Sequence, residues 1–155
     1  MELPELKKQY NTLESKYKLP SFKSLNEDFE IDKIDKESDC LLRIVRKVIM
    51  EKLVNTMQFL DGLLNPVNTP RIYIAYIKSM SIEDKESIDK IYDKIATVSL
   101  NSLSLEIGYD EKKEAELIKE IYKIWEEIKP NLSKIIENIK NPTKTNPKKE
   151  KSYYS

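Results

Sequence analysis

One stretch of the chain constrains its fold more than any other. Residues 39–64 read DCLLRIVRKVIMEKLVNTMQFLDGLL, and on a helical wheel their apolar side chains cover about half of the circumference or more. A helix with so wide an apolar face packs against several neighbours at once, and the face is too broad for a helix that only lies on a membrane. We therefore expect residues 39–64 to form the central helix of a bundle.

Two cations have unusual positions on this helix. Arg43 and Lys47 lie on the side opposite the apolar face. Arg46 and Lys52 project from within that face or from beside it. Their long aliphatic stems can cover apolar neighbours while the charged ends reach a carboxylate or water, and we favour this interpretation. The alternative is that Arg46 and Lys52 receive an anionic ligand.

Composition favours helices in the rest of the chain as well. Of the 155 residues 35% are charged and only two are glycine, which suits helices and leaves few of the glycines that tight strand turns need. Residues 70–79 are ambiguous, because Ile72, Ile74 and the neighbouring tyrosines would also fit a strand. No second strand candidate exists to pair with this stretch, so we expect a short helix there, capped by Thr69.

Apolar periodicity predicts three further helices. The first, within residues 1–18, carries a narrow seam formed by Leu3, Leu6, Tyr10, Leu13 and Tyr17. The second begins at Ser81 and ends near Gly108, with a core stripe of Ile88, Ile91, Tyr92, Ile95 and Leu103. The last begins after Asp110, continues through Pro130 and buries Ile118, Ile121, Tyr122, Trp125, Ile128, Leu132, Ile136 and Ile139.

These elements predict an all-α fold, a single-domain helical bundle of four main helices and one short one. Residues 1–18 form the N-terminal helix and residues 19–37 a linker with one helical turn begun at Ser21. Apolar side chains are expected to hold that linker across the bundle: Phe22, Leu25, Phe29 and Ile31. Residues 38–140 are the helical core, one domain together with residues 1–37, and residues 141–155 are a disordered basic tail.

The inventory of reactive residues argues against an enzyme. The chain contains no histidine, which removes histidine general-base catalysis and the common zinc and di-iron helical motifs. It has no glycine-rich phosphate loop, and its single cysteine, Cys40, is interpreted as a packed structural residue. Acidic residues in first helical turns are explained by the helix dipole. We expect no catalytic, metal-binding or cofactor-binding residue, and no cofactor.

Two groups of residues could bind nucleic acid or another anion. One is the cluster Arg43, Arg46 and Lys47, and the other is a set in the tail comprising Lys144, Lys148, Lys149, Lys151, Tyr153 and Tyr154. Lysines bind phosphates in a salt-sensitive manner, and tyrosines stack on unpaired bases. However, the formal net charge of the chain is zero, so no long-range field steers it onto a polyanion. Solvated side chains are the simpler explanation of both groups.

The seam of the first helix allows two arrangements. It can fold back onto its own bundle, or it can pair with the same seam of a second molecule. We favour packing onto its own chain, because so short a helix is marginal as an isolated coiled coil. For the intact protein we nevertheless expect a homodimer through some surface, since a binding protein commonly presents an apolar patch.

The sequence also bears on location. The first ten residues, MELPELKKQY, lack the apolar run of a signal peptide, and one cysteine cannot form an intramolecular disulfide. No uninterrupted apolar window approaches the roughly 20 residues of a membrane-spanning helix. We expect a cytoplasmic protein that does not cross a membrane.

Three stretches, LPSFKSLNEDFEI, LLRIVRKVIMEKL and AELIKEIYKIWEEIKPNL, together resemble a group of short all-helical archaeal proteins of uncharacterised function. The resemblance covers roughly residues 19–140 and rests on overall pattern. It implies one all-α domain in an intracellular, archaeal-type setting, and it transfers no catalytic residue and no ligand. The leading prediction is therefore a non-enzymatic interaction or scaffold protein with a protein partner. The alternative is a nucleic-acid-associated accessory protein that uses the tail and the Arg43, Arg46 and Lys47 cluster.

Overall fold

The computed structural model describes residues 2–35, 39–67 and 69–141, and over these residues the chain is all-helical, without a strand. The α-helices follow in the order α1 (Leu3–Tyr17), α2 (Phe22–Phe29), α3 (Leu41–Leu64), α4 (Arg71–Ser79), α5 (Ile82–Ser104) and α6 (Glu111–Lys140). A short 3-10 turn, η1 (Ile31–Lys33), follows α2. The all-α class predicted from composition is confirmed.

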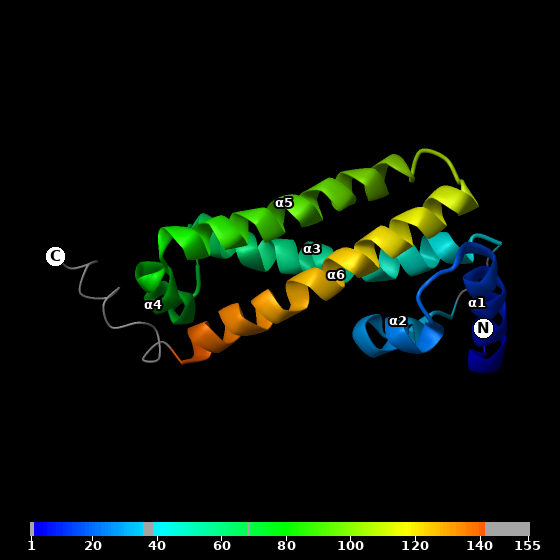
Figure 1. The fold of residues 1–155 in the computed structure, drawn as a ribbon, viewed down its shortest axis with the longest axis horizontal. Coiled ribbons are helices and arrows are strands. Elements are labelled where there is room, and N and C mark those ends of the chain that lie inside the picture. Colours follow the sequence, from blue (N-terminus) through cyan, green and yellow to red (C-terminus); the bar gives the residue numbers. More distant parts are fainter. Residues whose placement is uncertain (1, 36–38, 68, 142–155) are drawn as a thin grey trace.

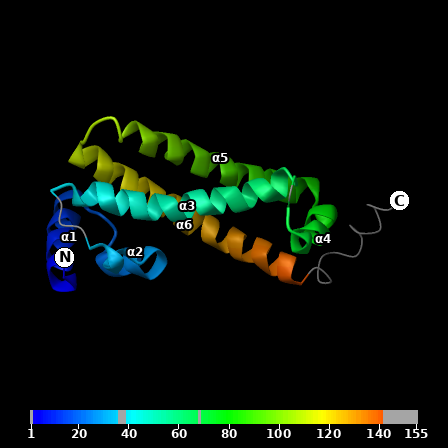
Figure 2. The ribbon, with the colours of Figure 1, turned by 180° about the vertical axis from the view of Figure 1, so that it is seen from behind.

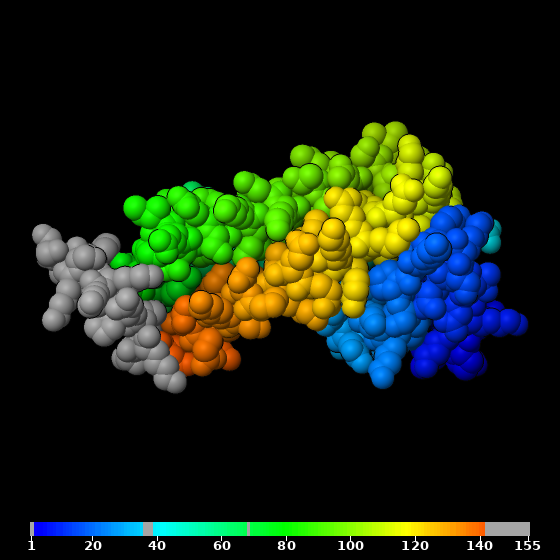
Figure 3. All heavy atoms as spheres, in the orientation of Figure 1, coloured from blue at the N-terminus to red at the C-terminus, as the bar shows by residue number. Residues whose placement is uncertain are grey.

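The three long helices α3, α5 and α6 run side by side along the molecule (Figures 1 and 2). Helices α1 and α2 pack at one end, mainly against α3 and α6. Helix α4 lies at the other end, where it packs against α6 and where its Tyr73 ring contacts Phe59 of α3 at 5.7 Å. The short helices thus gather on α3 and α6, while α5 forms an outer edge of the molecule (Figure 3).

Helix α3 is the spine expected for residues 39–64. It packs along both α5 and α6, and its fully buried side chains include Leu42, Ile49, Leu53 and Leu60. Buried side chains from all six α-helices join in one apolar cluster around it. No helix among the described residues is long and apolar enough to cross a membrane.

Residues 19–35 are more structured than the predicted linker. Ser21 caps α2 by accepting a hydrogen bond from the Ser24 backbone, as predicted, but the helix runs for two turns and not one. Phe22, Leu25 and Phe29 are spaced three and four apart, so they share one face and are all buried, as is Ile31. The expectation that apolar side chains hold this segment on the bundle is confirmed.

The seam of α1 packs onto its own chain. Leu6 and Tyr10 are buried, Leu13 and Tyr17 are half-buried against the core, and only Leu3 is exposed. Tyr10 also donates a hydrogen bond from its hydroxyl to the Pro20 carbonyl at 2.5 Å. Burial in these contacts raises the Tyr10 pKa far above its ordinary value, and the nearby Glu14 adds to the effect. The seam is therefore a structural contact within the monomer.

Predictions about helix ends were right in part. Residues 71–79 form the short helix α4, Ser81 and Asp84 form a reciprocal capping box on α5, and Asp110 caps α6. Thr69 does not cap α4, because its hydroxyl donates to the Gly62 carbonyl at 3.0 Å. The expectation for Gly108 was also wrong: α5 ends at Ser104 and Gly108 has no positive φ. The left-handed C-caps are Lys18 and Glu30, after α1 and α2.

Helix α6 continues through Pro130 to Lys140, as predicted. Its buried face differs from the predicted one, because Tyr122 is only half-buried and Glu114, Ala115 and Leu117 are buried as well. In addition, Ile135 is buried and Ile136 is exposed. The two residues are adjacent and equally apolar, so helical spacing alone does not distinguish them. The predicted basic tail lies outside the described residues, apart from Asn141.

Candidate interaction surface on α5

A buried ion pair connects the spine to α6. Arg46 is 1% exposed and Glu114 is fully buried. The guanidinium donates from Nε to Oε2 of Glu114 and from Nη2 to Oε1, the second contact at 3.2 Å. This two-point contact matches the planar fork of a guanidinium to a carboxylate. Glu114 lies in the first turn of α6 and Arg46 in the second turn of α3, so the pair joins the starts of the two helices.

The same guanidinium also connects α3 to the end of α5. Its Nη1 donates to the Ser102 hydroxyl at 2.6 Å, and its Nη2 contacts Oε1 of Glu106 at 2.8 Å. Burial alone would lower the pKa of Arg46, but the hydrogen bonds to Glu114 and Glu106 outweigh burial and raise it. One side chain therefore holds the three long helices together at this level of the bundle.

Arg43 and Lys47 lie at the edge of this network. Arg43 donates to the Leu105 carbonyl at 2.8 Å, contacts Glu114 at 3.4 Å and lies 5.3 Å from the centre of the Tyr109 ring. Lys47 forms an ion pair with Glu106 at 3.4 Å. The cluster singled out from the sequence is thus brought together, but its charges are met by carboxylates of the same chain. Arg46 in particular is buried, as expected for a packed cation.

Lys52 also acts within the molecule. Its ammonium donates to the Asp28 carbonyl of α2 and lies 5.0 Å from the centre of the Trp125 ring of α6 and 5.5 Å from that of Phe29. Lys129 forms an ion pair with the Asp28 side chain at 3.1 Å. These contacts hold α2 on α3 and α6, which supports the structural interpretation of Lys52.

The hydrogen bond from Arg46 lowers the pKa of Glu106, and Lys47 adds to the effect. A carboxyl group whose pKa is lower in the folded state contributes stability at neutral pH, and this contribution is lost as the pH falls through the folded pKa. We expect the wild-type chain to lose more stability than Glu106→Gln between pH 7 and about pH 3, where glutamate takes up a proton. Urea unfolding at several pH values measures the difference. Equal losses in both proteins would contradict a role for this carboxylate.

The rotation of α5 places Ser102, and not Leu103, against the Arg46 network. The buried stripe of this helix is Ile88, Ile91, Ile95, Val98 and Ser102. Ser102 occupies the position that continues the stripe, and its hydroxyl meets the guanidinium of Arg46 there. Leu103, which was predicted to be in the core, is therefore turned outward and is 65% exposed. The physical reason is that the three- and four-residue spacing of the stripe leads to Ser102, whose hydroxyl also pairs with the buried cation.

As a result, the outer side of α5 carries a group of exposed aliphatic side chains, which we call the α5 strip: Leu100, Leu103 and Ile107. Leu100 is 68% exposed, and Ile107, in the turn that follows the helix, is 90% exposed. Residues 95–105 contain no charged side chain, which is the longest such run in a chain where 35% of residues are charged. An exposed helix face that is both apolar and free of charge is unusual in so charged a protein.

A groove between α3 and α5 adjoins the strip. Leu100 and Leu103 form one wall, and Met50 and Val54 of α3 lie across from them. The groove has a volume of about 410 Å³, and its lining also includes the charged residues Arg46, Lys47, Glu51 and Glu106. In Figure 2 the two helices that border it run next to each other along most of their length. The exposed leucines of the strip thus border a groove that has both apolar walls and charged lining residues.

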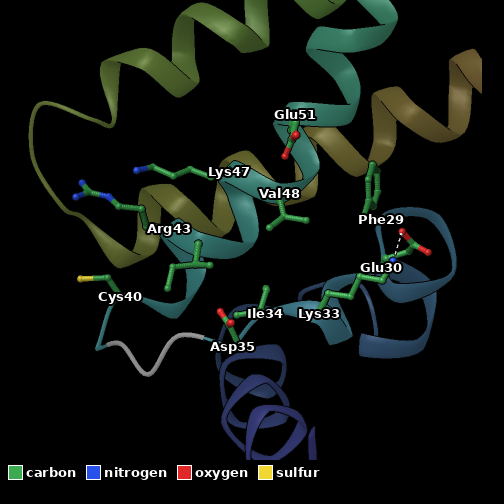
Figure 4. A pocket seen from close by; sticks show the side chains of 11 residues that line it. Phe29, Glu30, Lys33, Ile34, Asp35, Cys40, Arg43, Lys47, Val48 and Glu51 are labelled. Carbon is green, nitrogen blue, oxygen red and sulfur yellow. Dashed lines mark hydrogen bonds and ion pairs between the residues drawn. The ribbon is translucent and has the colours of Figure 1, made fainter. Parts of the chain in front are cut away.

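A second groove, of about 490 Å³, separates α3 from the η1 region (Figure 4). Phe29, Ile34 and Val48 line its interior, whereas Arg43 extends to the far side of α3 in this view. Cys40 is half-buried at its edge. The rim carries charges of both signs, and it does not direct several polar groups at one point. No group of three acidic or cysteine side chains among the described residues could hold a metal ion.

Fold and surface together define an all-helical bundle whose outer helix, α5, ends in a charge-free segment with exposed leucines. No protein-family model, no curated protein and no solved structure matches the chain. The resemblance to short archaeal helical proteins stays a prediction. Sequence reasoning missed Glu106, Glu114 and the α5 strip, although the charge-free run of residues 95–105 was a signal for the strip.

Proposed function

We propose that this chain is a non-enzymatic interaction protein that binds a protein partner through the α5 strip. The observation that carries the proposal is the exposure of Leu100, Leu103 and Ile107 beside the groove between α3 and α5. The centres of protein interfaces are depleted of charged residues, and contiguous exposed apolar patches commonly mark interaction sites. The α5 strip has both properties.

The placement of the basic cluster supports this choice over nucleic-acid binding. Arg46 is buried, and Arg43 and Lys47 contact Glu114 and Glu106. Phosphate contacts from this cluster would have to replace these ion pairs. The alternative function therefore depends on the lysines and tyrosines of the tail, which lie outside the described residues.

The doubly substituted chain Leu100→Glu/Leu103→Glu is expected to lose its protein partner. Two negative charges at the centre of an apolar contact would be desolvated without a counter-charge, so binding should weaken at least about a hundredfold. Pull-down from an extract of the native host, followed by binding measurements on the captured protein, tests this. Both side chains are exposed, so the helical circular dichroism spectrum and the unfolding midpoint should change little.

Ile82→Glu is the matched control. Ile82 is 79% exposed at the first position of the same helix, away from the strip, and a negative charge is favourable at a helix N-terminus. This variant should capture the same partner as the wild type. Retention of that partner by the double glutamate variant would place the binding surface elsewhere.

A further inference from the structure

We propose that the partner is a second copy of this chain, with the two α5 helices packed antiparallel about a two-fold axis that passes between Leu100 and Leu103. The proposal rests on the proposed function of the α5 strip and specifies its occupant. The apolar side chains of the strip are exposed, and the short helices pack mainly against α3 and α6.

The spacing of the strip is self-complementary. Leu100 and Leu103 are three residues apart on one side of α5. In a two-fold contact, residue i meets residue j and residue j meets residue i. An axis between the two leucines therefore places Leu100 of each copy against Leu103 of the other.

The charge pattern of α5 favours this occupant and this direction. Residues 95–105 carry no charge, so the surface meets its own copy without like-charge contacts at the centre. The N-terminal part of the helix is charged, with Asp93 and Lys94 both exposed. Lys94 faces α6, where it pairs with Glu127 at 3.3 Å. A parallel pair would bring Asp93 close to Asp93 of the other copy, whereas the antiparallel pair separates the two.

The size of the surface predicts a dimer of moderate affinity. A standard interface buries about 800 Å² on each partner. Three exposed side chains supply only part of this area, and the neighbouring groove, with Met50 and Val54 opposite the leucines, can receive side chains of the second copy. We expect a dissociation constant on the order of micromolar, so that the dimer dissociates on dilution.

Sedimentation velocity and light scattering of the full chain over a concentration series test the proposal. The wild type and Ile82→Glu should change from monomer to dimer with the same dissociation constant. Leu103→Glu should weaken the association at least tenfold, and Leu103→Asn, which adds no charge, should weaken it less. A wild-type chain that stays monomeric to millimolar concentration overturns the proposal, as does a dimer that Leu103→Glu leaves unchanged.

A distance measurement tests the direction of the two helices. A spin label at Asp93→Cys, in a Cys40→Ser background, lies about 13 Å along α5 from the proposed axis at 1.5 Å per residue. Electron–electron double resonance should therefore give a separation of about 25–30 Å in the antiparallel dimer. Parallel helices in contact would bring the labels within about 10 Å. If the dimer depends on Leu103 but the two labels are within about 10 Å of each other, the antiparallel arrangement is wrong.

Failure of this inference differs from failure of the proposed function. The wild type could stay monomeric and capture a different protein, and Leu100→Glu/Leu103→Glu could abolish that capture. This result would contradict the second copy as partner but would keep the binding role of the strip. If neither self-association nor capture depends on these leucines, both proposals are wrong.

Discussion

Glu114→Leu is expected to lower the free energy of unfolding by about 3–5 kcal/mol, since removal of one partner of a buried ion pair leaves the other charge uncompensated. The remaining charge is the Arg46 guanidinium, which is 1% exposed. It would keep its contacts with Ser102 and Glu106 but would lose the carboxylate that both Nε and Nη2 contact. Urea unfolding followed by circular dichroism measures the loss.

The doubly substituted chain Arg46→Met/Glu114→Leu is the control. Replacement of a whole buried ion pair by apolar side chains of similar volume is often neutral or stabilising. We expect the double variant to recover most of the stability that Glu114→Leu loses. A double variant as unstable as the single one would mean that the volume of these side chains, and not their charge, determines the effect.

Tyr10→Ala is the second substitution with a large expected effect, a loss of about 3–5 kcal/mol, as for other buried aromatic side chains cut back to alanine. Tyr10 is fully buried and its ring meets Phe22 edge to face at 5.8 Å. Because the seam of α1 packs on its own chain, the folded fraction of this variant should self-associate as the wild type does. Unfolding and sedimentation measured on the same samples separate the two effects.

Two neighbouring substitutions serve as comparisons. Leu3→Ala changes an exposed seam residue and should cost little, typically within about 0.5 kcal/mol. Tyr10→Phe keeps the ring but removes the hydrogen bond to the Pro20 carbonyl, and should cost about 1–2 kcal/mol. Loss of self-association in Tyr10→Phe with the fold intact would show that α1 does contribute to an interface.

The main helices could be predicted because their signals are local. The wide apolar face of residues 39–64 identified α3, and side-chain caps at Ser81 and Asp110 marked the starts of α5 and α6. Residues 19–37 were underestimated, because a two-turn helix with only three apolar residues resembles a linker until its packing partner is known. Buried Phe29 packs against Trp125, almost a hundred residues further along the chain.

The interaction surface could not be predicted, because its position depends on contacts between distant residues. Ser102 and Leu103 are adjacent, and the buried stripe that ends at Ser102, with its hydrogen bond to Arg46, turns Leu103 outward. The partners of Arg46 are 56 to 68 residues away in sequence. A single sequence does not show which of its many glutamates and serines occupy those places.

Residues of the Arg46 network and residues of the α5 strip are expected to be conserved for different reasons. Arg46, Ser102 and Glu114 can change only as a set, because any single step passes through a state with a buried and poorly paired charge. Descendants of this chain should therefore inherit them together or replace them together. Leu100 and Leu103 face solvent in the monomer, so the fold allows each to drift on its own. If lineages keep both leucines, selection for binding, and not for stability, preserves them.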